Sequence, residues 1–350
     1  MSIYDSQIYF QDLDIAINSI VRREELKGKS VLITGATGTI GSFIVDMLMR
    51  YNAVDSADIT IYVSGRDLSK LSERFSGIKT DKLIYVQYNI KDDTMFDYPI
   101  DYIIHAAGNA HPAAFNGDPV GTMVGNVKGT YSLLEYAKTH NTKRFLYVSS
   151  GEVYGRGETT IEGFKEEYSG YVNPLSPRSC YPLSKRAVEN LCVSYTKQYG
   201  LETVIARPCH TYGPGITKSD SRANAQFFRN AVNGEDIVLK SAGTQLRSYC
   251  YVADCASAIL TILLNGEVGE AYNTANSNAR VTIADFAKVI AETVGKEVVF
   301  LLPNDYDLAN RTPIDKQVLC CRKIESLGWK GQYSIEDGVK HTIDILKEMV

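Results

Sequence analysis

The sequence has 350 residues, of which 44% are hydrophobic and 22% charged, and its formal net charge is −4 at neutral pH. These values are ordinary for a globular protein that buries a substantial core in one large domain or two. The sequence contains no basic run of the kind that indicates nucleic-acid binding. No apolar run reaches the roughly 18 residues of a membrane span. The first residues lack the basic and apolar regions of a secretory signal.

The cysteines bear on the cellular compartment. There are seven of them, scattered along the chain apart from the adjacent Cys320 and Cys321, and none forms a Cys-x-x-Cys pair. An odd, scattered set suits a reducing cytosol better than a disulfide framework. The His and Cys residues form no cluster with metal-ligand spacing. We therefore expect a cytoplasmic protein without a metal site.

The first predicted element is a helix over residues 12–25, within an N-terminal extension of residues 1–28. Apolar residues recur there at helical spacing, which predicts packing on the body of the protein or on a partner subunit. A buried strand over residues 30–34 and a helical pattern over 42–49 then flank residues 35–41, Gly-Ala-Thr-Gly-Thr-Ile-Gly. Glycines let the backbone turn and let a pyrophosphate approach the helix N-terminus, which attracts anions. The turn predicts a dinucleotide site; the alternative is a tight turn without a ligand.

Strand and helix patterns then alternate along the chain. Strands are predicted over residues 59–63, 82–88, 102–107, 144–148 and 203–206, and helices over 120–138 and 181–199. This alternation predicts a parallel sheet with helices on both faces, which binds ligands beyond the carboxyl ends of its strands. After Pro208 the pattern loosens into helices over 224–232, 253–264, 282–294 and 334–349 among short strands. We expect a smaller substrate-covering lobe there, partly interleaved with the sheet.

Two segments carry residue types suited to catalysis. Ser149 and Ser150 follow the strand over 144–148, and the helix over 181–199 opens with Tyr181 and Lys185, which share one helix face. An ammonium beside a phenol favours the phenolate, and a tyrosine, whose usual pKa is about 10, needs such help to act as a base. The Ser150 hydroxyl could bridge the phenol and a substrate hydroxyl. The alternative is a solvated helix face, because 23 tyrosines make a chance Tyr-x-x-x-Lys match easy.

Together these motifs resemble the extended short-chain dehydrogenases/reductases, and within them the NAD-dependent epimerase/dehydratase family, which acts on nucleotide sugars. The resemblance spans roughly residues 29–345 and includes the glycine turn, Ser149-Ser150-x-x-Val-Tyr-Gly, Tyr-x-x-x-Lys and Arg207-Pro208-x-x-x-Tyr-Gly-Pro, in family order and spacing. It implies an α/β fold with a Rossmann-type doubly wound parallel sheet over residues 29–210. Residues 211–350 would mainly form the smaller nucleotide-sugar lobe.

The resemblance implies catalytic and cofactor roles for individual residues. Tyr181 would take a proton from the sugar O4 with help from Ser150, and both would contact the substrate. Lys185 would bind the nicotinamide ribose. A hydride would pass from C4 to the cofactor, and most members later return it. The expected cofactor contacts are Gly35, Thr37, Gly38, Thr39, Ile40, Gly41, Arg66, Asn89, Ile90, Ala106, Ala107 and Lys185.

Further residues match positions that meet the substrate in this family. Arg247, in Thr-Gln-Leu-Arg-Ser-Tyr, matches an arginine that meets the nucleotide diphosphate, and Arg311 is expected to do the same. The alternative for Arg247 is a surface ion pair. His210 stands where many members carry an asparagine that faces the nucleotide, and a structural histidine is the alternative. Asn126 matches an asparagine whose role is largely structural.

The cofactor site departs from the family pattern at one point. The acid that normally ends the second strand and binds the adenosine ribose is missing, and this strand continues into Ser64-Gly65-Arg66-Asp67. An arginine there can accommodate a 2′-phosphate, so NADP stays open. A cofactor that is recycled internally in this family is usually NAD, which we expect here. Asp67 could instead cap the following helix.

The residue at position 152 distinguishes between family reactions. Simple 4-epimerases usually carry a small residue there, and 4,6-dehydratases carry an Asp-Glu pair whose Asp position is Gly151 in this chain. Enzymes resembling UDP-glucuronate decarboxylase keep the acid, here Glu152, without that Asp, and show Pro-Arg-x-Cys-Tyr as in residues 177–181. We therefore expect a decarboxylase-like reaction with Glu152 as a catalytic residue, and dehydratase and epimerase remain the alternatives.

Two interpretations from other classes stay open. One is a nucleotide-sugar-binding protein without turnover, against which the presence of Tyr181 and Lys185 argues. The other is a net reductase of a small carbonyl, which Arg66 favours and Arg247 disfavours. By analogy with the family, we expect a homodimer joined by a helix bundle that includes the Tyr-Lys helix, with no nucleic-acid or membrane partner.

Overall fold

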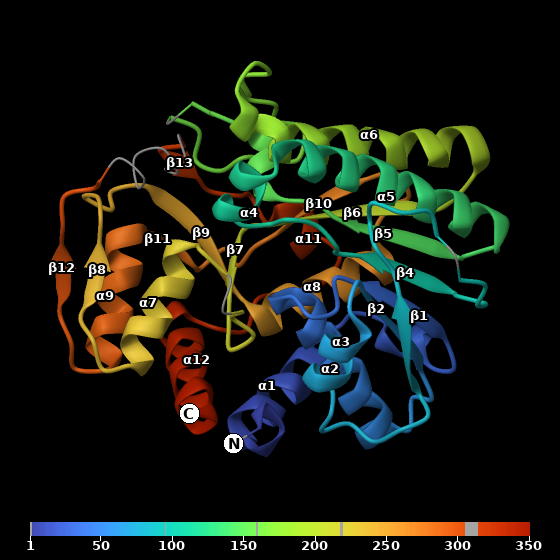
Figure 1. Cartoon of the computed structure of the whole chain (residues 1–350), viewed down its shortest axis with the longest axis horizontal. Coiled ribbons are helices and arrows are strands. Elements are labelled where there is room, and N and C mark those ends of the chain that lie inside the picture. The colour runs from blue at the N-terminus through green and yellow to red at the C-terminus, as the bar shows by residue number, and fades with distance from the viewer. Residues whose placement is uncertain (1, 95, 159, 218–219, 305–313) are drawn as a thin grey trace.

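A seven-stranded parallel sheet forms the centre of the protein in the computed structural model, which describes residues 2–350 except 95, 159, 218–219 and 305–313. Its strands are β1 (Ser30–Thr34), β2 (Thr60–Gly65), β3 (Leu83–Gln87), β4 (Tyr102–His105), β5 (Arg144–Val148), β6 (Thr203–Pro208) and β10 (Ala271–Thr274). Their order is β10-β6-β5-β4-β1-β2-β3, and every pairing is parallel (Figure 1). The order reverses between β1 and β4, so the crevice beyond these two strand ends is the expected ligand position. The expected fold class is confirmed.

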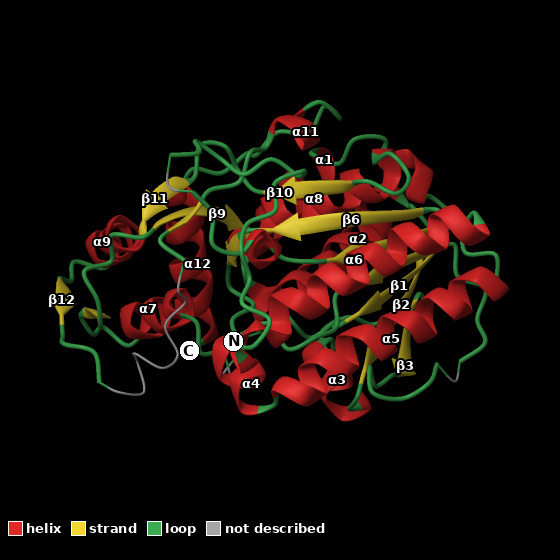
Figure 2. Ribbon diagram, turned by 90° about the horizontal axis from the view of Figure 1, so that it is seen from above, coloured by secondary structure: helices red, strands yellow, loops and turns green. Residues whose placement is uncertain are grey.

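Helices cover both faces of the sheet because the strands are apolar on both sides. On β1, Val31 and Ile33 belong to one buried cluster and Leu32 to the other. The first face is covered by α2 (Thr39–Asp55) and α8 (Val252–Asn265), on which α1 (Gln7–Asn18) packs, and the second by α5 (Pro119–Thr139) and α6 (Cys180–Tyr199). Figure 2 shows α5 and α6 side by side across the sheet. Short elements at the strand ends are α3 (Leu68–Arg74), α4 (Pro112–Gly117), η3 (Gly151–Tyr154) and η4 (Pro177–Ser179).

The N-terminal helix differs from its prediction over residues 12–25. It begins at Gln7 because the Ser6 side chain accepts a hydrogen bond from the Tyr9 N–H and caps the helix. It ends at Asn18, and Arg22 then adopts a left-handed conformation before the short turn η2 (Arg23–Leu26). The predicted helix was therefore wrong at both ends. The helix packs on α2, on α8 and on the C-terminal helix α12 (Ile335–Met349).

The second half of the chain builds a smaller lobe and also completes the central sheet. β10 pairs with β6 at the edge of the sheet, and α8 covers the sheet. The lobe contains β7 (His210–Tyr212), β8 (Ile237–Leu239), β9 (Leu246–Tyr251), β11 (Arg280–Thr282), β12 (Val298–Phe300), β13 (Lys316–Gln317), α7 (Ala223–Val232), α9 (Ile283–Thr293) and α11 (Arg322–Glu325). Its β9 pairs with β7, β11 and β13. No helix in the described part of the chain is long and apolar enough to cross a membrane.

Candidate active site

The glycine turn between β1 and α2 has the geometry of an anion cradle. Gly35 has a φ of +68°, and a Cβ on it would lie 2.7 Å from the Ala106 carbonyl oxygen at the end of β4. A Cβ on Gly41 would lie 2.4 Å from the Gly35 carbonyl oxygen. Both glycines are therefore required for the turn to pack against the helix and the neighbouring strand. Gly38 is the N-cap of α2 and offers no side-chain cap, so the first N–H groups of this helix are available to a ligand.

The remaining residues of the turn lie at the same strand ends. Thr37 is exposed, whereas Thr39 and Ile40 are half-buried at the start of α2. The Thr39 hydroxyl donates to the Gly215 carbonyl oxygen at 3.0 Å, which brings a loop of the second half of the chain against the turn. This turn, with its uncapped helix and the excluded Cβ positions, fits the pyrophosphate of a dinucleotide.

The neighbouring strand ends complete the predicted cofactor contacts. Arg66 is exposed directly after β2, and the Asp67 side chain accepts from the Ser69 and Lys70 N–H groups and caps α3. Asp67 is therefore a helix cap, and Arg66 is the charged side chain next to it. The Ala107 N–H, one residue after Ala106, donates to the Thr34 hydroxyl at 3.1 Å.

The loop after β3 carries the two other predicted contacts, Asn89 and Ile90. The Asn89 amide side chain bonds within its own loop, to Asp92 and to the Lys91 N–H. Ile90 lies against Gly125 and Gly129 of α5, where a Cβ on Gly129 would be 2.6 Å from the Ile90 carbonyl oxygen. The close approach of α5 to this loop thus holds it at the carboxyl edge of the sheet.

Ser150, Tyr181 and Lys185 come together at the end of β5. Tyr181 and Lys185 lie in the first turns of α6 and are 6% and 4% exposed. The Lys185 ammonium donates to the Val148 carbonyl oxygen at 2.8 Å and lies 5.7 Å from the centre of the Tyr181 ring. The Ser150 hydroxyl lies beside Tyr181 and accepts from the Glu152 N–H at 3.1 Å. The structure therefore brings together the serine, tyrosine and lysine that sequence patterns had placed in separate elements.

Burial dominates the electrostatics of this group. It raises the pKa of Tyr181 to about 12, and the nearby Glu152 carboxylate adds to the rise, whereas the Ser150 side chain and the positive charges of Arg222 and Arg178 oppose it. Burial likewise lowers the pKa of Lys185 to about 8, against the attraction of Glu189. Both groups are pushed toward their neutral forms, so the protein alone does not hold a phenolate at neutral pH.

Asn126 supports the catalytic helix from α5. Its amide donates to the Ser184 hydroxyl at 2.9 Å, and that hydroxyl donates to the Tyr181 carbonyl oxygen at 3.0 Å. The side chain thus bonds to the first turn of α6, in keeping with the structural role expected of it.

Glu152 forms an ion pair that no sequence pattern pointed to. Both carboxylate oxygens accept from the Arg178 guanidinium, at 2.8 and 3.0 Å. The guanidinium lies over the Phe115 ring, and Phe115 stacks on Tyr181 with 5.1 Å between ring centres and 12° between planes. Phe115 comes from α4, so three separate segments converge here. In the sequence, Arg178 was recognised only as part of the Pro-Arg-x-Cys-Tyr motif, and its contact with Glu152 was not predicted. No signal in the sequence pointed to Phe115.

Comparisons with known proteins place this chain in a family. The sequence profile of the NAD dependent epimerase/dehydratase family matches residues 31–275. The chain belongs to this family. UDP-glucuronic acid decarboxylase 1 of Xenopus tropicalis is 32% identical over 326 residues, covering 91% of this chain and 72% of the relative. UDP-glucuronic acid decarboxylase 3 of Arabidopsis thaliana is 31% identical over 314 residues, covering 88% of this chain and 86% of the relative.

Solved structures of the epimerase/dehydratase type share the fold. The UDP-glucose 4-epimerase of Thermotoga maritima with UDP-glucose superposes with a TM-score of 0.77 at 24% identity, covering 91% of this chain and 99% of that one. The Bordetella bronchiseptica enzyme WbmF in complex with NAD+ superposes with a TM-score of 0.73 at 26% identity, covering 93% and 94%. The family uses NAD, and the glycine turn described above fits that cofactor.

Two further predicted substrate contacts, Arg247 and His210, lie on the lobe strands β9 and β7. Arg247 is 3% exposed, and its guanidinium donates to the carbonyl oxygens of Leu246, Ile314 and Asp315. His210 is half-buried on β7, its Nδ1 has no hydrogen-bond partner among the described residues, and burial lowers its pKa to about 3. Arg311 lies outside the described residues. The contacts of Arg247 and His210 with a nucleotide stay predictions.

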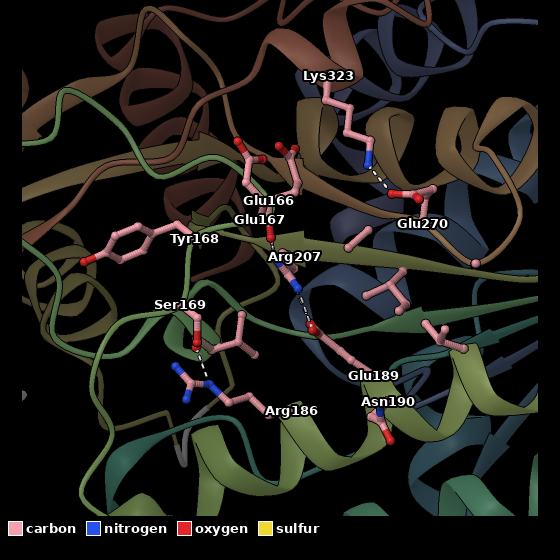
Figure 3. Close-up of a pocket in the computed structure, with 15 residues that line it drawn as sticks. Glu166, Glu167, Tyr168, Ser169, Arg186, Glu189, Asn190, Arg207, Glu270 and Lys323 are labelled. Atoms are coloured by element: carbon pink, nitrogen blue, oxygen red, sulfur yellow. Dashed lines mark hydrogen bonds and ion pairs between the residues drawn. The ribbon is translucent and has the colours of Figure 1, made fainter.

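A polar cleft of about 460 Å³ lies elsewhere, along α6, edge strand β10 and α11 (Figure 3). None of the described residues predicted to act in catalysis lines it. Arg207 donates to both carboxylate oxygens of Glu189 on α6, at 2.9 and 2.7 Å, and to the Tyr154 hydroxyl on η3 at 2.9 Å. These bonds connect β6 to the catalytic helix and to η3. We therefore interpret the charged residues of the cleft as structural.

Proposed function

We propose that this family member decarboxylates a nucleotide-linked uronic acid, with UDP-glucuronate as the substrate. The observation that carries the proposal is Glu152, held by Arg178 beside Tyr181, with Gly151 where dehydratases carry an acid. The named decarboxylase relatives support the same reaction. A dehydratase would need a second acid at position 151 to expel water from C6, and glycine supplies none.

The proposed division of labour follows the two halves of the chain. Residues 29–210 would hold NAD at the glycine turn and the strand ends, and residues 211–350 would mainly hold the nucleotide sugar. NAD, when bound, supplies the hydride acceptor for the sugar C4 and later the hydride donor. Lys185 would hold the nicotinamide ribose, and Arg247, His210 and Arg311 would meet the nucleotide.

Tyr181 would exchange the proton of the sugar O4 hydroxyl. The Ser150 hydroxyl, which lies beside the phenol, would bridge it to that hydroxyl. Burial and the nearby Glu152 carboxylate raise the pKa of Tyr181 to about 12, and Arg222 and Arg178 offset only part of this rise, so the phenol needs further positive charge beside it to act as a base. Loss of the O4 proton and of the C4 hydride leaves a ketone at C4.

The ketone makes loss of CO2 from C5 easy. The C5 carboxylate is then β to a carbonyl, so the C5–C6 bond breaks and its electron pair forms an enolate. Reprotonation at C5 and return of the hydride to C4 complete the cycle without net oxidation. Glu152 would position the sugar or relay the C5 proton, in keeping with its place between Ser150 and Arg178.

We propose a homodimer as well. The outer face of α5 exposes Val120 (73%), Met123 (38%), Val124 (49%) and Tyr131 (50%), and α6 beside it exposes Val193 (39%). Such an apolar face on two adjacent helices suits a bundle with the same helices of a second copy.

We also propose a cytoplasmic location, because all seven cysteines carry free thiols.

The test is turnover of a panel of nucleotide sugars. Purified protein with NAD is incubated separately with UDP-glucuronate and with UDP- and dTDP-linked glucose, with Tyr181→Phe as the inactive control. We expect CO2 and a UDP-pentose from UDP-glucuronate, with no lasting rise in reduced cofactor. A 4-keto-6-deoxy product from a glucose substrate, with UDP-glucuronate untouched, would make the protein a dehydratase. Inversion at C4 without a change in mass would make it an epimerase.

A further inference from the structure

We infer that Arg178 is a positioning residue that sets the orientation of the Glu152 carboxylate in the active site. The inference rests on the proposed function, in which Glu152 acts on the sugar. It adds a residue whose role neither the family resemblance nor the relatives assign.

The contacts between Arg178 and Glu152 fix the orientation of the carboxylate as well as its distance from the guanidinium. Nη1 of Arg178 donates to Oε2 of Glu152 at 2.8 Å, and Nη2 donates to Oε1 at 3.0 Å. Two parallel bonds from a planar fork determine the plane of the carboxylate as well as its position. A lysine ammonium would keep the charge but would leave that plane free to rotate.

The Arg178 guanidinium is itself held in place. Its central carbon lies 5.1 Å from the centre of the Phe115 ring, and the Cys180 thiol donates to the Phe115 carbonyl oxygen at 3.6 Å. Arg178 lies in η4, directly before the helix that carries Tyr181. The fork therefore connects the start of the catalytic helix to η3, where Glu152 follows Ser150.

The pair remains partly accessible from the active site. The side chains of Arg178 and Glu152 are each 19% exposed, so solvent and a bound ligand can reach them. The two-point bond beside Tyr181 fixes where the carboxylate points. Arg178→Lys keeps the positive charge of the pair, so it tests orientation without leaving the Glu152 carboxylate unpaired.

The experiment is a double-mutant cycle with Arg178→Lys, Glu152→Gln and the double variant, followed by kcat and KM. We expect Arg178→Lys to lower kcat by about tenfold to a hundredfold, as a misplaced catalytic group does, with KM within about twofold of wild type. The double variant should be no slower than Glu152→Gln alone, because Arg178 acts through Glu152. The matched control is Arg50→Lys, since Arg50 makes two 2.8 Å bonds to Asp14 and lies 5.2 Å from the Phe10 ring, away from the active site.

Two outcomes would overturn the inference: an unchanged kcat in Arg178→Lys, whether or not KM rises, or a double variant in which the two effects multiply. The cycle uses whichever nucleotide sugar the wild type converts. If that sugar is not UDP-glucuronate, the proposed reaction is contradicted, but the role of Arg178 can still be tested with the sugar that is converted. A crystal structure of Arg178→Lys provides a readout that needs no turnover. We expect the Glu152 carboxylate to be rotated there, and an unmoved carboxylate would refute its positioning by Arg178.

Discussion

Replacement of Asp12 by alanine should destabilise the whole protein, although Asp12 lies in the N-terminal extension and far from any predicted site. Asp12 is fully buried on α1. Its carboxylate accepts hydrogen bonds from the Tyr251 hydroxyl at 2.5 Å, the Tyr333 hydroxyl at 2.7 Å and the His341 Nδ1 at 2.8 Å. These donors belong to β9, the segment before α12, and α12, so one carboxylate joins α1 to the C-terminal part of the chain.

The size of the effect follows from what alanine leaves behind. Three donors lose their acceptor, namely the buried hydroxyls of Tyr251 and Tyr333 and the half-buried ring of His341, and each bond to a charged group contributes about 1.5–3 kcal/mol. Because neighbouring groups relax, removal of one partner from a buried charged network costs about 3–5 kcal/mol in practice. An entropy of unfolding of about 2.1 cal/mol/K per residue corresponds to about 1.4 °C per kcal/mol for a chain of this size, so the Tm should fall by about 4–7 °C.

Thermal unfolding followed by circular dichroism measures this fall, and Asp14→Ala is the matched control. Asp14 lies on the same helix, and its pair with Arg50 is 39% exposed on the Asp14 side. Such a surface pair contributes less than about 1 kcal/mol. If Asp12→Ala lowered the Tm no more than Asp14→Ala does, the three-donor network would not stabilise the fold.

The same network predicts how stability depends on pH. The hydrogen bond to Asp12 raises the pKa of His341 above its usual value. A histidine whose pKa is higher in the folded state stabilises that state fully below its unfolded pKa of about 6.5, and this contribution is lost as the pH rises through the folded pKa. His341→Gln should therefore lower the Tm more at pH 6 than at pH 8. Equal differences at both pH values would contradict the assignment.

Three further predictions concern the active site. Tyr181→Phe should retain bound NAD, measured after denaturation, but lose at least about a hundredfold in kcat, and near wild-type turnover would remove Tyr181 from the mechanism. Gly41→Ala should purify without NAD, because its Cβ would lie 2.4 Å from the Gly35 carbonyl oxygen, whereas Gly117→Ala, with nothing within 4 Å, should retain it. Arg66→Asp should shift the ratio of NADP to NAD affinities toward NAD, because a carboxylate repels a 2′-phosphate. An unchanged affinity ratio would show that Arg66 points away from the ribose.

The central sheet could be predicted from the sequence because its signals are local. Apolar β-branched runs such as residues 30–34 and helical spacing over 120–138 each lie within one element, and both elements form where expected. The glycine turn is equally local, since its conformation and the following helix are set by neighbouring residues. The start of α1 was missed because the Ser6 cap that determines it lies outside the apolar pattern.

Contacts between distant segments could not be predicted in this way. Glu152 and Arg178 are 26 residues apart in the sequence, and Asp12 and His341 are 329 residues apart. A charged residue has many candidate partners in 350 residues, and only packing of the intervening elements selects one. The Phe115 ring between Arg178 and Tyr181 belongs to a helix of six residues, for which periodicity gives no reliable signal.

The Tyr-x-x-x-Lys motif shows how the difference between local signals and contacts of distant segments affects the predicted chemistry. From spacing alone, Lys185 was expected to favour the phenolate of Tyr181. In the folded chain, the ammonium donates to the Val148 carbonyl oxygen, and burial raises the pKa of Tyr181 to about 12 while it lowers that of Lys185 to about 8. Because the phenol of this motif stays protonated at neutral pH, its reactivity depends on groups from other segments, among them Ser150 and Arg222, which lower its pKa. The residues that determine when Tyr181 can accept a proton are therefore those that only the tertiary structure brings next to it.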